Sequence, residues 1–135
     1  MWTITALVLA SAALAADLPV EVSGDTGKWE SGYGAKFYNV VGTVQNTGTK
    51  PLQYVQLKVE LLDAAGKVVA SMETYNENAE ALTAPGADAA ALVKAGKVKP
   101  LAAGATERFR TSFLEEETPK FESHRVVVVA APVAG

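Results

Sequence analysis

Hydrophobic and polar residues alternate strictly along residues 55–61. Valine and leucine occupy the odd positions, and glutamine, lysine and glutamate occupy the even ones. Because successive side chains of a β-strand point to opposite faces, this period of two predicts a strand with one buried and one exposed face. Residues 40–46 show a related alternation before a polar loop at 46–51. Four residues of that strand are predicted to share one face: Val40, Gly42, Val44 and Asn46.

Similar strand patterns recur along the chain, separated by residues that favour turns. The predicted strands cover residues 20–22, 29–33, 37–46, 52–63, 67–75, 97–101, 106–113 and 124–131. No long amphipathic helix interrupts them. The pattern predicts an all-β fold, an immunoglobulin-like antiparallel β-sandwich of about seven strands, with a small closed barrel as the alternative. We expect the strands between residues 37 and 75 to pair in sequence order as a meander.

Residues 76–96 break the strand pattern because they are rich in alanine and hold few large apolar side chains. Asp88 is suited to cap a short helix over 89–95, and Gly96 is suited to end it. We therefore expect an Ala-rich surface insertion, partly helical, between two strands. Both a functional loop and a neutral insertion are consistent with this composition.

The first residues have the pattern of an export signal. The apolar run Ile4–Ala16 is shorter than the about 20 residues that a transmembrane helix requires. It ends in Ala13-Leu14-Ala15, the small-x-small pattern of a cleavage site. We interpret residues 1–15 as a signal peptide, cut after Ala15 or one residue later. The mature protein is then expected to be periplasmic or extracellular, with no transmembrane anchor.

The expected organisation of the mature chain has three parts. Residues 16–36 form a Gly-rich N-terminal segment, residues 37–131 form the β-sandwich domain, and residues 132–135 form a tail. The chain has no cysteine, so an exported domain of this size is expected to depend on its hydrophobic core rather than on disulfides.

Charge and composition limit the kinds of ligand that the protein is expected to bind. The net charge is −3, from 12 basic and 15 acidic residues, and a mildly acidic chain is not typical of nucleic-acid binding. With one histidine and no cysteine, the chain has few ligands for zinc or copper, and we expect no metal and no cofactor.

Spaced glycine, asparagine and hydrophobic positions also follow a recognisable family pattern. They are Val40, Gly42, Val44, Asn46 to Gly48, Leu61 to Asp63, Gly66, Val68 to Ala70, Leu101, Gly104 and Phe109. Over residues 37–131, this pattern resembles the FxLYD family of bacterial exported domains. The resemblance implies a β-sandwich in the cell envelope or outside the cell, and it supplies no catalytic residues.

Catalytic chemistry has little support in the residues. His124 is the single histidine, and its position at the start of the last predicted strand favours a surface role. No nucleophile motif of the form G-x-S-x-G occurs. We therefore expect no enzyme and no catalytic residue.

Aromatic residues gather near the N-terminal strands. Trp29, Tyr33 and Tyr38 are the candidate ligand platform, because aromatic faces stack on sugars and pack on peptides. Packing in the core is the competing interpretation. The leading functional hypothesis is a non-enzymatic module for protein interaction or a structural role, with an unknown protein partner. The alternative is a carbohydrate or cell-surface binding domain.

Overall fold

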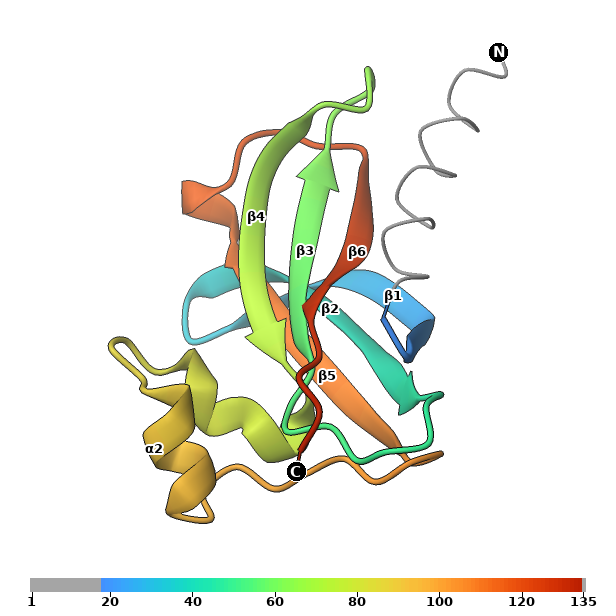
Figure 1. Ribbon diagram of the computed structural model, residues 1–135. Helices are drawn as coiled ribbons and strands as arrows, with labels where there is room; N and C mark the ends of the chain where they lie inside the picture. The colour runs from blue at the N-terminus through green and yellow to red at the C-terminus, as the bar shows by residue number, and fades with distance from the viewer. Residues whose placement is uncertain (1–17, 135) are drawn as a thin grey trace.

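The computed structural model describes residues 18–134 (Figure 1). The predicted signal peptide, residues 1–15, lies outside these residues. The described chain is mostly antiparallel β-sheet. One sheet has the order β1-β2-β5, and the other has the order β4-β3-β6. The bounds are β1 Val20–Gly32, β2 Ala35–Asn46, β3 Gln56–Leu62, β4 Val68–Tyr75, β5 Thr106–Leu114 and β6 Ser123–Ala130.

In the part of the chain that the structure describes, three short helices accompany the strands. They are η1 Glu77–Thr83, α2 Ala89–Lys94 and η2 Glu115–Glu117. In residues 18–134 no helix combines the length and the apolar character that crossing a membrane requires.

The all-β prediction is confirmed, with six strands in residues 18–134 rather than about seven. The two short strands predicted before residue 34 are one continuous strand, β1. Residues 97–101 contribute only an isolated bridge between Leu101 and Leu52. The expected boundary between residues 36 and 37 falls inside β2.

The predicted meander is wrong at its first step, because β2 and β3 belong to different sheets. Residues 47–55 carry the chain from one sheet to the other. β2 pairs with β1 and β5, whereas β3 pairs with β4 and β6. Alternation reveals which face of a strand is buried, but it does not reveal which strand lies beside it.

Both sheets contribute to a single hydrophobic core. The predicted faces are confirmed: Val40 and Val44 are fully buried in β2, and Leu57, Val59 and Leu61 are fully buried in β3. The core cluster comprises Val20, Val40, Val44, Leu52, Val55, Leu57, Val59, Leu61, Leu101, Phe109, Phe113, Val128 and Ala131.

The edges of the two sheets meet on both sides of the core. On one side the Thr74 hydroxyl of β4 donates to the carbonyl of Arg110 in β5 at 2.7 Å. On the other side, β6 approaches β1 through the side chains of His124 and Asp25. Figure 1 shows the strands of one sheet running across those of the other.

The segment 76–96 contains the predicted helix, α2, and the Asp88 carboxylate accepts from the backbone N–H of Ala91 at 3.2 Å. The segment is also tied to the fold at its start, because Asn76 is fully buried. Ala79 and Leu82 of this segment form a second small buried cluster with Val98, so this part of the expected surface insertion is packed into the domain. The tail is likewise attached, since Ala134 donates to the carbonyl of Pro51 at 2.9 Å.

Candidate functional site

A bulge in β1 positions the first residue of the candidate site. Ser23 pairs with Thr43 and Thr26 pairs with Val41, so Gly24 and Asp25 together oppose one residue of β2. Gly24 has a φ of 63°, a left-handed conformation that glycine adopts without a steric penalty. A bulge of this kind bends the strand and redirects its side chains. Here it turns the Asp25 carboxylate toward β6.

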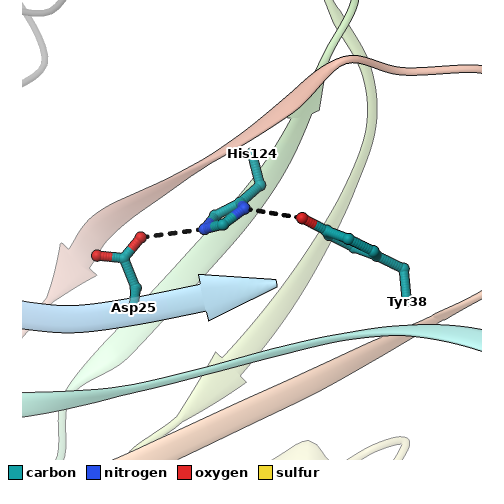
Figure 2. A network of polar contacts seen from close by, with 3 residues as sticks. All are labelled: Asp25, Tyr38 and His124. Carbon is teal, nitrogen blue, oxygen red and sulfur yellow. Dashed lines mark hydrogen bonds and ion pairs between the residues drawn. The ribbon is translucent and has the colours of Figure 1, made fainter. Parts of the chain in front are cut away.

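Asp25, His124 and Tyr38 form a hydrogen-bonded chain between the two sheets, which we call the β1–β6 clip (Figure 2). His124 Nε2 lies 3.0 Å from Asp25 Oδ2, and His124 Nδ1 lies 3.1 Å from the Tyr38 hydroxyl. A neutral imidazole satisfies both contacts when Nε2–H donates to Asp25 and Nδ1 accepts from Tyr38. The His124 side chain is only 15% exposed. His124 lies near the start of β6, as expected, but its ring is mostly covered because it contacts Asp25 and Tyr38.

The clip connects β1 and β2 of one sheet to β6 of the other through the His124 ring. Burial raises the pKa of Tyr38 above its ordinary value of 10.0. A nucleophilic hydroxyl needs the opposite shift or a free position near a substrate. The Tyr38 hydroxyl instead lies against the backbone of β1, where a Cβ at Gly27 would collide with it.

Replacement of Tyr38 by Phe is expected to reduce the loss of stability at alkaline pH. Because the pKa of Tyr38 is raised in the folded state, its contribution is fully present below about pH 10 and is lost as the pH rises through the folded pKa. At neutral pH, loss of the hydroxyl should lower the free energy of unfolding by about 1 kcal/mol. Urea unfolding at a series of pH values between about 8 and 11 measures both effects.

Tyr33→Phe is the matched control, because its side chain is wholly exposed. Tyr33→Phe should show the same fall in the free energy of unfolding with rising pH as the parent. Part of this fall should remain in Tyr38→Phe, since burial, followed by the charge of Glu73 and then Tyr54, also raises the pKa of Tyr75. If the free energy of unfolding fell equally with pH in Tyr38→Phe and in the parent, buried Tyr38 would not contribute to the loss of stability at alkaline pH.

The structure brings together two of the three residues of the predicted platform. The ring centroids of Trp29 and Tyr38 are 5.2 Å apart, and Phe121 lies 5.8 Å from Trp29 and 4.8 Å from Tyr38. Trp29 is at the edge of this cluster and is 39% exposed. Tyr38 is partly buried beneath it.

Tyr33 lies apart from this cluster, at the tip of the β1–β2 hairpin. Its side chain is wholly exposed, and its φ of 53° is unusual for a residue other than glycine. With Gly34 at a φ of 76°, it forms the two-residue turn that joins β1 and β2.

A shallow depression of about 310 Å³ opens beside Trp29. We call it the Trp29 depression. Its lining is Trp29, Glu115, Thr118, Pro119, Lys120 and Phe121. Lys36 places its Nζ 5.4 Å from the centre of the Trp29 ring and pairs with Glu115 at 3.9 Å. The depression therefore has an aromatic floor and charged groups of both signs at its rim.

Sequence reasoning did not identify Phe121, Asp25 or the bonded state of His124. Phe121 lies in an irregular loop with no periodicity to mark it. The clip joins residues that are 86 and 99 positions apart, and a single sequence carries no local signal for such contacts.

No model of a protein family and no curated protein matches the sequence. Among solved structures, the chain is similar to one titled "X-ray structure of Northeast Structural Genomics Consortium target SoR45". The two share 12% sequence identity over 87% of this chain and 86% of that one, with a TM-score of 0.36. A likeness at this TM-score supports no inference about fold or function.

Proposed function

We propose that the protein is an exported, non-enzymatic interaction module of the bacterial envelope or the cell exterior. The predicted signal peptide supports export. The two antiparallel sheets around one core support a β-sandwich of immunoglobulin-like type, in keeping with the resemblance to FxLYD domains. The function is then binding to a protein partner through an exposed surface.

The exposed ring of Trp29 in the Trp29 depression is the observation that carries this proposal. Tryptophan is enriched among the residues that dominate binding energy at protein interfaces, where it fills a desolvated centre surrounded by polar groups. Lys36 and Glu115 provide such a polar rim beside the ring. A second ring, Phe121, extends the apolar floor.

Carbohydrate binding is the second candidate, because the same ring has hydrogen-bonding neighbours. Glu115, Thr118 and Lys120 line the Trp29 depression together with Trp29. Sugar rings stack their apolar faces on aromatic side chains, and polar groups around the aromatic ring bind the hydroxyls.

Trp29→Ala is expected to abolish binding while the domain still unfolds cooperatively. Removing a half-exposed ring should lower stability by about 1–2 kcal/mol, less than a fully buried aromatic residue would. The measurement is recovery of proteins from envelope extract by the immobilised parent and variant, followed by titration of each recovered protein against both. Soluble oligosaccharides titrated in parallel test the second candidate.

Val129→Ala is the matched control, because Val129 is an exposed apolar residue at 43% on β6. It should retain binding. Equal recovery of the same partner by the parent and by Trp29→Ala would place the binding surface elsewhere. Turnover in a broad screen of hydrolytic substrates would overturn the non-enzymatic assignment.

A further inference from the structure

A groove opens where the two sheets separate beyond their contact at β4 and β5, and we call it the β4–β5 groove. The edges are joined at Thr74 and Arg110, and again by a bridge between Asn76 and Phe109. The groove has a volume of about 420 Å³, within the range of about 300–1,000 Å³ typical of small-ligand sites. Figure 1 shows β5 passing behind the end of β4 at this place.

Met72 shows that the groove exposes part of the core face. Met72 pairs with Val59, so both side chains lie on the same face of their sheet. Val59 is fully buried, whereas Met72 is 44% exposed. The other sheet therefore reaches Thr74 of β4 but does not cover Met72. Val41 is another apolar residue in the groove, and it is 40% exposed.

Charged side chains of opposite sign line the groove. Arg108 and Arg110 lie two residues apart on β5, and Glu77 and Glu80 lie on η1. Within residues 18–134, none of these four side chains takes part in an ion pair. Glu73 also lines the groove, but its carboxylate already accepts a hydrogen bond from Gln56 at 2.9 Å.

This arrangement is complementary to a ligand that carries both charges. A guanidinium group presents a planar set of donors that matches a carboxylate, and two arginines on one strand strengthen that preference. The Glu77 and Glu80 carboxylates suit an ammonium group. Two of the elements that line the groove, β4 and β5, are edge strands of their sheets, and extended peptides commonly bind along sheet edges.

We propose that the β4–β5 groove binds a short zwitterionic peptide in extended conformation. Its carboxylate pairs with Arg108 and Arg110, and its ammonium group lies near Glu77 and Glu80. The antiparallel bridge between Asn76 and Phe109 places Met72 beyond Arg110, so the side chain of the C-terminal residue contacts Met72. A tripeptide of about 10 Å in length is a short probe that carries both charged ends and apolar side chains. This site is separate from the Trp29 depression, so the proposal does not depend on the proposed function.

Three tripeptides test the proposal by NMR titration of the protein. The probes are tri-alanine, tri-alanine acetylated at its N-terminus, and tri-alanine amidated at its C-terminus. Tri-alanine should shift the amide resonances of residues 72–74 and 108–111. Each blocked form should bind about tenfold more weakly, as expected for the loss of one charge-assisted contact of about 1.4 kcal/mol.

Arg110→Gln should weaken tri-alanine binding about tenfold, whereas Lys67→Gln, on the exposed β3–β4 turn, should not change it. The proposal is overturned if tri-alanine causes no shift in these residues. It is also overturned if the three probes bind equally, or if Arg110→Gln binds like the parent.

Discussion

Gly42→Val is expected to lower the free energy of unfolding by about 3 kcal/mol or more. A Cβ at position 42 would lie 2.7 Å from Cζ of Phe109 and 3.0 Å from the Cα of Asp25. Phe109 is almost fully buried, so its ring cannot move aside without disturbing the core. The Asp25 contact is with backbone, which is held by the bulge in β1. Overpacking at such a position typically costs about 1–3 kcal/mol, and here two neighbours resist at once.

Thr43→Val provides the matched control on the same strand. The Thr43 side chain is on the opposite face, where its hydroxyl lies 3.0 Å from that of Ser23 and donates to the Ser23 carbonyl. Both bonds are exposed, so their loss should cost under about 1 kcal/mol, and valine suits a strand. Urea unfolding compares the two variants. Equal midpoints would show that the faces of β2 are reversed.

Asn76→Ala is expected to cost about 3 kcal/mol. The fully buried Asn76 side chain accepts from the backbone N–H of Val55 at 2.7 Å and donates to Glu107 at 2.9 Å. Alanine would leave the buried N–H of Val55 without this acceptor, and an unsatisfied buried group costs about 1–3 kcal/mol. It would also leave a cavity between β3 and β5. Thermal and urea unfolding measure the loss.

Asn78→Ala separates this effect from the loss of a contact to Glu107. The exposed Asn78 side chain donates to the same carboxylate, at 2.6 Å. Because water replaces that bond, the cost should be under about 1 kcal/mol. If both variants lost the same stability, the buried amide of Asn76 would not be a structural anchor. Asn76, together with the buried Ala79 and Leu82, ties the start of the segment 76–96 to the fold.

The faces of the strands were predictable because alternation is a local property. Leu57 and Leu61 are buried where their spacing indicates. The partner of each strand was not predictable, because β2 and β3 have compatible hydrophobic faces whether they pair or pack across the core. In the structure, β2 and β3 pack against each other across the core, and the chain between them passes from one sheet to the other.

In the candidate site, too, local features were predictable from the sequence, whereas contacts between distant residues were not. Trp29 and Tyr38 were identified by composition and lie together because they are cross-strand partners on β1 and β2. Tyr33 is close to both residues in the sequence, but it lies in the tight turn between β1 and β2, where its side chain is exposed and away from the Trp29–Tyr38 cluster. His124 and Asp25 meet only because two strands from opposite ends of the chain form neighbouring sheet edges.

The β1–β6 clip has a consequence for when the domain folds. It joins residues 99 positions apart, and β6 also supplies an edge of the β4-β3-β6 sheet. A chain that emerges N-terminus first therefore cannot complete its core until its last strand is present. Loop-closure entropy delays such distant contacts further. The domain is therefore expected to acquire resistance to proteolysis only when β6 is present to close the β4-β3-β6 sheet.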